Sequence, residues 1–361
     1  MPVNKDTLLT SLLAASGGKV EVKYNVNGDP SIFVRIPRFN CEDIHPDLGI
    51  GPHPAFVVNG AVKSELWIGM YQGIVEKNCI LSLPGQNPAV GINFDNAKLY
   101  CQNNGPGFHL MTAWEWAAVA LWTLKNGTQP RGNTNYGKAY EAAWERGTPV
   151  NSASPATTLT GSGPASWRHD GTYQGIADLV GNIWEWNDGF KLVDGRIYAP
   201  ADNHFTLSEN EWPAQSVYFD SPGTPGDRNE SAIVGSPILS NGITVYTEPP
   251  TPAGGGDTGN FNYTYNASWK AMATSAGYNE LSLEVRQMMA RLLVAPRVGS
   301  GGDPLFPAIM GGVWARNYGA RFPRRGGRWL STSEAGLGTL DLFDVQSSVN
   351  SVVGCRPAFL L

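Results

Sequence analysis

The chain has 361 residues, a formal net charge of -5, 43 glycines and 12 tryptophans, and only 16% of its residues are charged. Soluble proteins average about 25% charged residues, so this composition indicates a rigid, turn-rich, aromatic protein and excludes a mostly disordered one. No run approaches the ~20 apolar residues of a membrane-spanning helix, and the acidic balance argues against a nucleic-acid partner, which would need a clustered basic face.

Residues 1–31 are predicted to form an extension of one helix and one strand. Asn4–Ser16 carries four leucines at helical spacing and predicts a short amphipathic helix. A weak signal peptide is the alternative, although its basic region is thin and contains Asp6. The alternating runs Val20–Val26 and Ile32–Phe39 flank an Asn-Gly turn, which is the strongest short hairpin signal.

Further elements follow in chain order. Glu65–Tyr71 is predicted to be a strand, and Thr112 to Glu115 form a capping box that begins a core helix. Residues 127–175 predict long ordered loops, and residues 247–259 predict a surface excursion. Asn279–Leu293 keeps helical periodicity until Pro296 and predicts a second helix.

The four cysteines, Cys41, Cys79, Cys101 and Cys355, have no metal-binding spacing and no dense disulfide pattern. Buried free thiols are the favoured interpretation, and a bridge between Cys79 and Cys101 is the alternative.

Three motifs occur in a fixed order: FHLMTAWEWAA at Phe108–Ala118, DLVGNIWEW at Asp178–Trp186, and RGGRW with a closing GCRPA between Arg325 and Ala358. Together they resemble the formylglycine-generating-enzyme type of C-type lectin fold. The resemblance implies an α+β domain over residues 32–361, with two helices, small twisted antiparallel sheets, long loops, and a loop insertion at about 191–264.

The last fifty residues are similar to the variable proteins of diversity-generating retroelements, through WARNYGARFPRRGGRW at Trp314–Trp329 and AGLGTLDL at Ala335–Leu342. Cys355 stands where that family's closing motif usually has an aromatic. The resemblance implies a receptor-binding protein that displays hypervariable residues from about 326–353, with Trp329 and the Gly326-Gly327 turn as fixed framing. The partner would be a protein or glycan receptor on a host or target cell. The protein would sit on a virion tail tip or bacterial surface, with oligomerisation or virion attachment through the N-terminal region.

Within this tail, Thr339–Phe343 alternates and predicts a half-buried strand with Leu340 and Leu342 facing the core. In that family the variable segment is rewritten by replacing adenines of a template, and the resemblance implies asparagine codons in the template at variable positions. Adenine replacement in an asparagine codon never yields glutamate, so Glu334 would come from another codon or be fixed, and the same holds for Gln346. The predicted variable, ligand-binding residues are Leu330, Ser331, Ser333, Glu334, Asp341, Phe343, Asp344, Gln346, Ser348, Asn350, Ser351 and Val352.

The alternative function is an oxidase or sulfoxide synthase, as in the enzymes that share this fold. A tail with Cys355 as its only cysteine argues against a two-thiolate site, and the five histidines show no metal-ligand spacing. The favoured prediction is therefore a binding protein that is not an enzyme and requires no cofactor. The resemblance also implies a calcium site at Asn182 and Glu185. The alternative is that Asn182 turns the chain and that Trp184 and Trp186 pack in the core.

The arginines at 316, 321, 324, 325 and 328 form a basic cluster in this tail. Within so acidic a chain, we still expect no nucleic-acid partner.

Overall fold

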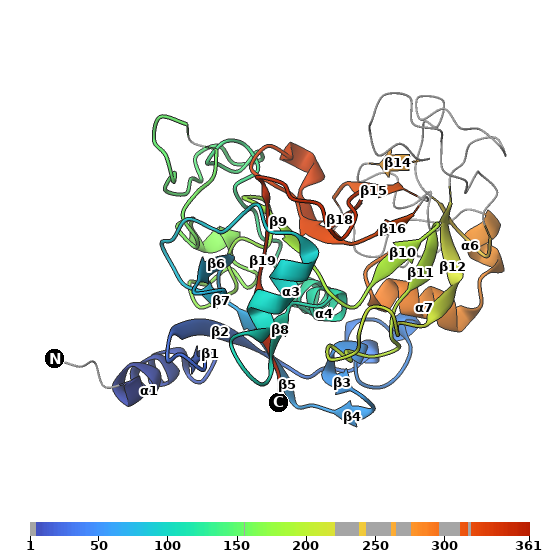
Figure 1. The fold of residues 1–361 in the computed structure, drawn as a ribbon, viewed down its shortest axis with the longest axis horizontal. Coiled ribbons are helices and arrows are strands. Elements are labelled where there is room, and N and C mark those ends of the chain that lie inside the picture. Colours follow the sequence, from blue (N-terminus) through green and yellow to red (C-terminus); the bar gives the residue numbers. More distant parts are fainter. Residues whose placement is uncertain are drawn as a thin grey trace.

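A computed structural model of the protein describes residues 5–154, 156–220, 238–242, 261–264, 276–295, 311–316 and 319–361. Helices and three multistranded sheets combine in an α+β arrangement (Figure 1). The smaller described elements are α2 (Cys41–Ile44), η1 (Pro46–Leu48), η2 (Pro54–Phe56), β3 (Val57–Val58), β4 (Ala61–Val62), β6 (Gly73–Glu76), β7 (Cys79–Ser82), η3 (Ala165–Trp167) and η7 (Thr332–Glu334).

The first sheet joins the two ends of the chain. Its order is β1-β2-β5-β20-β8, so the C-terminal strand lies between two early strands. The predicted hairpin is confirmed, and the Asn25 side chain closes its turn by accepting bonds from the backbone N–H groups of Asn27 and Asp29. Its strands are β1 (Val20–Tyr24), β2 (Pro30–Pro37), β5 (Glu65–Gly69), β8 (Phe108–Leu110) and β20 (Pro357–Phe359).

The N-terminal helix α1 (Lys5–Ser16) precedes this sheet and projects from the body of the molecule (Figure 1). Antiparallel pairing runs along β1 and β2 as far as Val20 and Val34. The predicted boundary between residues 31 and 32 falls inside β2, so the hairpin crosses it. Residues 1–31 therefore contribute an edge strand to the main sheet.

The central helix α4 (Ala113–Lys125) is buried along most of its length. Its predicted capping box is confirmed: Thr112 Oγ1 accepts from the Glu115 N–H at 3.1 Å, and the Glu115 carboxylate accepts from the Thr112 N–H at 2.9 Å. A further short helix, α3 (Phe94–Gln102), lies outside the predicted helices. The expectation of two helices is therefore too low.

The predicted helix over Asn279–Leu293 is interrupted. The structure has α6 (Ala276–Glu280) and α7 (Leu283–Arg291), separated at Leu281 and Ser282. The Ser282 hydroxyl accepts from the Val285 N–H and begins α7, as an N-cap serine does. Periodicity continues across the break because both short helices bury apolar residues in one core cluster.

The sheet of the C-terminal segment has the order β14-β15-β18-β17-β9-β19. Most of its pairings are antiparallel as expected, but two, β15 with β18 and β9 with β19, are parallel. Its strands are β9 (Trp184–Trp186), β14 (Phe261–Thr264), β15 (Val313–Arg316), β17 (Arg324–Gly326), β18 (Gly336–Leu342) and β19 (Val353–Cys355).

The third sheet has the order β13-β12-β11-β10-β16, and much of it lies in the segment predicted as a loop insertion. Residues 247–259 lie outside the described residues. The long loops predicted for residues 127–175 are confirmed. Among the described residues of this segment, the short helix η3 is the only regular element, and the β-pairing is limited to isolated bridges. The strands are β10 (Lys191–Val193), β11 (Arg196–Tyr198), β12 (Ala214–Asp220), β13 (Ile238–Ser240) and β16 (Ala320–Arg321).

Two further expectations concern the interior. All four cysteines are free and buried, which confirms the favoured interpretation of the thiols. In the described part of the chain, every helix is too short or too polar to cross a membrane.

Candidate ligand-binding site

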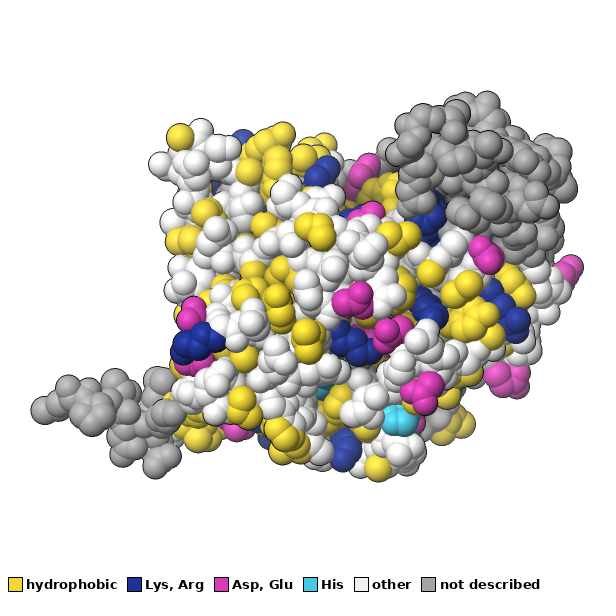
Figure 2. All heavy atoms as spheres, in the orientation of Figure 1, with side chains coloured by type: hydrophobic (Ala, Val, Ile, Leu, Met, Phe, Trp, Pro, Cys, Tyr) yellow, Lys and Arg dark blue, Asp and Glu magenta, His cyan; other side chains and the backbone are white. Residues whose placement is uncertain are grey.

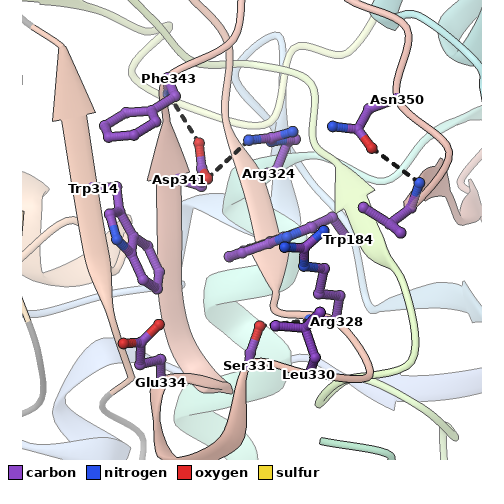
Figure 3. Close-up of a pocket in the computed structure, with 11 residues that line it drawn as sticks. Trp184, Trp314, Arg324, Arg328, Leu330, Ser331, Glu334, Asp341, Phe343 and Asn350 are labelled. Atoms are coloured by element: carbon purple, nitrogen blue, oxygen red, sulfur yellow. Dashed lines mark hydrogen bonds and ion pairs between the residues drawn. The ribbon is translucent and has the colours of Figure 1, made fainter. Parts of the chain in front are cut away.

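A cavity of about 280 Å³ opens on one face of the C-terminal sheet (Figure 3). Its base comes from β9, β15, β17 and β18, and its walls come from the loops on either side of β18. We call it the C-terminal cavity. It is lined by Trp184, Trp314, Arg324, Arg328, Leu330, Ser331, Glu334, Asp341, Phe343, Asn350 and Val352.

Strand register sets the base of this cavity. Asp341 is paired with Trp314 on one side and with Arg324 on the other, and residues opposite each other in adjacent strands share a face. Because side chains alternate along a strand, Leu340 and Leu342 take the other face and join the main core. The rings of Trp184 and Trp314 meet edge to face across the cavity, with centroids 5.8 Å apart.

Arg324 is the charged centre of the base. Its guanidinium Nη2 lies 2.8 Å from Oδ2 of Asp341, and its Nη1 contacts the Asp344 carboxylate. The same guanidinium stacks over Trp184 and Trp186. Burial raises the pKa of Asp344 and the charge of Asp341 adds to that rise, while the positive charge of Arg324 opposes it. The base is thus a compact network that balances one buried cation with two carboxylates.

Arg325 points to the opposite face and ties the sheet to α7. Its guanidinium donates to the carbonyl oxygens of Leu292 and Leu293 just beyond the end of α7, and to that of Gly338 in β18. Burial lowers the pKa of Arg325 to about 9. Carbonyl groups at a helix C-terminus carry partial negative charge, which suits a buried guanidinium.

The turn at Gly326 and Gly327 sets where the cavity wall begins. Both residues have φ of +86°, in the left-handed region that favours glycine. A Cβ on Gly326 would lie 2.7 Å from the carbonyl oxygen of Leu179, so a side chain does not fit there. This supports the prediction that the turn frames the site.

The wall after this turn carries a cation and an acid. Arg328 and Glu334 both line the cavity, with Leu330 and Ser331 between them (Figure 3). The Ser331 hydroxyl accepts from the Arg328 backbone N–H at 3.0 Å, which fixes the local turn. Within the described part of the chain, no carboxylate lies within ion-pair distance of the Arg328 guanidinium.

Seven of the predicted variable residues line the C-terminal cavity: Leu330, Ser331, Glu334, Asp341, Phe343, Asn350 and Val352. Five others do not. Ser333 and Ser351 are exposed and Ser348 is partly buried, Asp344 pairs with Arg324 behind the base, and Gln346 donates to Asp95 and Glu209.

The prediction of a half-buried strand needs correction. Leu340 and Leu342 face the core as expected, but Thr339 and Asp341 on the other face are also buried, with Asp341 only 7% exposed. The Thr339 hydroxyl donates to the Glu334 carbonyl oxygen, and Arg324 covers Asp341. Alternation therefore predicts which face a residue takes, while the wall of the cavity decides its exposure.

Sequence reasoning missed the cavity role of Trp184, Trp314, Arg324 and Arg328. The interpretation of Trp184 as a core residue is half right, since it is 7% exposed but lines the cavity. The signal was present in the WEW and RRGGR motifs, but only strand register brings them to one face. Arg321, Arg324 and Arg325 are buried, so the basic cluster forms no exposed nucleic-acid face.

Asn182, just before β9, and Glu185, within β9, are both buried and hydrogen-bonded to other protein groups. The Asn182 Oδ1 accepts from the Asn133 amide and from both the N–H and hydroxyl of Thr158. Both carboxylate oxygens of Glu185 accept from the Arg356 guanidinium, at 2.8 and 2.9 Å. Protein donors therefore stand where a calcium ion would bind, and these residues do not fit a calcium site.

Two thiols meet in the core, which the sequence did not indicate. Cys101 in α3 interacts with Cys355 in β19, and both side chains are buried. Burial raises the pKa of Cys101 well above its usual value, and the thiol of Cys355 adds to the effect. A thiolate nucleophile needs the opposite shift and access to its substrate.

Comparison with known proteins gives one family match. Residues 71–211 match the FGE-sulfatase family, described as a Sulfatase-modifying factor enzyme 1-like domain. The mixed helices and small sheets described above give the chain an α+β, C-type lectin-like fold, as the sequence predicted. None of the curated proteins matches the chain.

Solved structures similar to the chain include the Major Tropism Determinant I1 variant, at 13% identity and a TM-score of 0.30, covering 86% of this chain and 53% of that one. The U1 variant gives 14% identity and a TM-score of 0.30, covering 91% of this chain and 62% of that one. This chain thus spans little more than half the length of these proteins.

Proposed function

We propose that this protein is a binding protein whose C-terminal cavity takes a group of a receptor or other surface ligand. One observation carries the proposal: seven side chains predicted to vary converge on a single cavity from the 330–334 wall, β18 and the 343–352 loop. The lining combines three aromatic rings with charged and polar side chains, so it offers a ligand both apolar contact and specific hydrogen bonds. The rings of Trp184 and Trp314 and the buried Arg324, none of which is predicted to vary, contribute to the base of the cavity.

Within this proposal, a retroelement rewrites the wall residues, and the protein is displayed on a virion or a bacterial surface. Sequencing the DNA beside the coding region tests the first part. We expect a near-identical copy of the codons for about residues 311–361, differing at adenines, next to a reverse transcriptase gene. A locus without such a copy would remove the retroelement from the proposal.

Binding is tested with labelled protein on a panel of bacterial cells and on a glycan array. The variant Leu330→Ser/Phe343→Ser alters two cavity walls, and the variant Val75→Ala/Leu99→Ala alters exposed residues on β6 and α3 as a control. We expect any cell or glycan that binds the natural chain to lose at least tenfold in affinity for the first variant only. Equal losses in both variants would contradict the site.

The enzyme alternative has one observation in its favour, the match of residues 71–211 to an enzyme family. The buried thiols of Cys101 and Cys355 weigh against it, because a substrate cannot reach them in this conformation. Turnover of a thiol peptide by the purified chain with added copper or iron would support the enzyme and overturn the binding proposal.

A further inference from the structure

A second cavity, of about 420 Å³, lies among the long loops between α4 and β9. We call it the hairpin cavity, because an isolated antiparallel bridge between Lys138 and Arg146 turns this loop back on itself. It is lined by Asn135, Tyr136, Gly137, Lys138, Arg146, Gly147 and Pro149. The green loops that hold it run beside the red C-terminal segment in Figure 1, and none of the predicted variable residues lines it.

Two cations line the hairpin cavity. Lys138 and Arg146 face each other across an isolated antiparallel bridge, and both line the cavity. Like charges directly opposite one another destabilise a strand pair. In the described part of the chain, neither lies within ion-pair distance of a carboxylate, and the nearby Glu145 is held by Arg131 and Trp167. An anion between the two cations would relieve their repulsion.

An aromatic ring stands at the edge of the same cavity. Tyr136 has φ of +50° and its side chain is 52% exposed, an uncommon combination for a bulky residue. Its N–H donates to the Trp329 carbonyl oxygen at 2.8 Å, and its ring meets the Trp329 ring with centroids 4.8 Å apart. Strained backbone of this kind concentrates at ligand sites, where the surrounding structure holds it.

The same hairpin exposes further aromatic side chains. Trp144 is 80% exposed and Tyr140 is 51% exposed, although large aromatics are usually buried. Figure 2 shows hydrophobic side chains, with Lys or Arg beside them, at the edge of the molecule where these loops meet the C-terminal segment. This surface combines flat rings with positive charge.

From these observations we propose that the hairpin cavity binds the anionic group of an acidic sugar unit, with Lys138 and Arg146 on the anion and the Tyr136 ring against the sugar. Charge-assisted hydrogen bonds from an ammonium and a guanidinium suit a carboxylate or a sulfate. A concave cavity with one exposed ring suits a single sugar unit better than a flat protein surface. The proposal does not depend on the C-terminal cavity.

Calorimetric titration of the full chain with four probes tests the proposal. The probes are an oligogalacturonate, a sulfated dextran oligosaccharide, a neutral maltooligosaccharide and polyglutamate. We expect the oligogalacturonate or the sulfated probe to bind, and the tighter of the two identifies the anion. Equal binding of the neutral probe, tighter binding of polyglutamate, or no binding of either acidic sugar would overturn the proposal.

Matched variants locate the binding. Lys138→Gln/Arg146→Gln removes both cavity cations, and Arg38→Gln/Lys125→Gln removes the same charge from exposed positions elsewhere. We expect at least a tenfold loss of affinity for the acidic sugar in the first and less than a twofold change in the second. Equal losses would mean that net charge, not the cavity, attracts the probe.

The ring and the other cavity are tested separately. Tyr136→Asn removes the ring but keeps a residue that tolerates positive φ, and we expect a severalfold loss of acidic-sugar binding. Leu330→Ser/Phe343→Ser should retain this binding. A loss in that variant alone would assign the sugar to the C-terminal cavity and reject the hairpin cavity, so the two proposals fail independently.

Discussion

Arg324 and Asp341 form an ion pair at the base of the C-terminal cavity, with Nη2 and Oδ2 2.8 Å apart and both side chains nearly buried. The pair comes from adjacent antiparallel strands, β17 and β18, in direct register. It places a residue predicted to vary in the role of counter-ion to a fixed arginine. Asp341 therefore belongs both to the base of the cavity and to the residues predicted to vary.

Replacing Asp341 should cost stability. In Asp341→Asn the buried guanidinium keeps only Asp344, and breaking a buried pair costs about 3 kcal/mol of unfolding free energy. Urea denaturation measures this loss. Asp344→Asn should cost less, because the Asp344 side chain is more exposed. A loss below that of Asp344→Asn would show that Asp341 is a free display position.

Other positions of the variable segment should behave differently. Within the part of the chain that the structure describes, the side chains of Leu330, Ser333 and Ser351 make no hydrogen bond or ion pair, so we consider Leu330→Ser, Ser333→Ala and Ser351→Ala. Each should shift the unfolding free energy by no more than about 0.5 kcal/mol, as is usual for surface sites. Thermal melts compare them with Asp341→Asn. A large loss at any of the three would place it in the core.

The turn that frames the cavity should not accept a side chain. Gly326→Ala combines strain at positive φ with a 2.7 Å approach to the Leu179 carbonyl oxygen, and we expect a loss of about 2 kcal/mol or more. Gly319→Ala is the matched control, because it has φ of +67° and, among the described residues other than its chain neighbours, the nearest atom to an added Cβ is 3.6 Å away. Similar losses in both variants would mean that strain alone, and not the contact, excludes a side chain.

Acid should destabilise the fold through two buried histidines. Burial lowers the pKa of His53 to about 3 and that of His169 to about 4, while both titrate near pH 6.5 when unfolded. As the pH falls from about 6.5 to 4, the unfolded chain takes up protons that the folded chain excludes, so stability falls.

His109 acts in the opposite direction. Burial would lower the pKa of His109, but the adjacent Glu115 carboxylate outweighs it and raises that pKa, so its contribution is lost as the pH rises. Urea denaturation at pH 7, 5 and 4 measures the unfolding free energy, which contains the contributions of all three histidines. His169→Gln keeps an acceptor for the Ile176 N–H. This variant should lose less unfolding free energy between pH 7 and pH 4, the acid limb of the stability curve, than the control His204→Gln. An unchanged limb would contradict the assignment to His169.

Calcium should not stabilise the protein. Arg356 already pairs with both carboxylate oxygens of Glu185, so adding calcium or a chelator should leave the melting temperature unchanged. Arg356→Met should instead cost about 3 to 5 kcal/mol, because it leaves a buried carboxylate without its partner. Calorimetric calcium binding that disappears in Glu185→Gln would refute this prediction.

Much of the local structure could be predicted because its causes are local. The Asn-Gly hairpin turn and the Thr112 capping box each depend on a few neighbouring residues, and both are confirmed. The short helix α3 and the break at Ser282 could not be predicted, because packing against other elements decides whether such short segments are helical. The fold class followed from motif order.

Which side chains share a face of a strand follows from the sequence alone, since alternation along Thr339–Phe343 is a property of the extended backbone. Which of these side chains are exposed follows from tertiary packing, and so does the exclusion of a side chain at Gly326 by the Leu179 carbonyl oxygen. Exposure depends on what packs opposite: Arg324 covers Asp341, Arg356 holds Glu185, and no carboxylate in the described part of the chain pairs with Lys138 and Arg146.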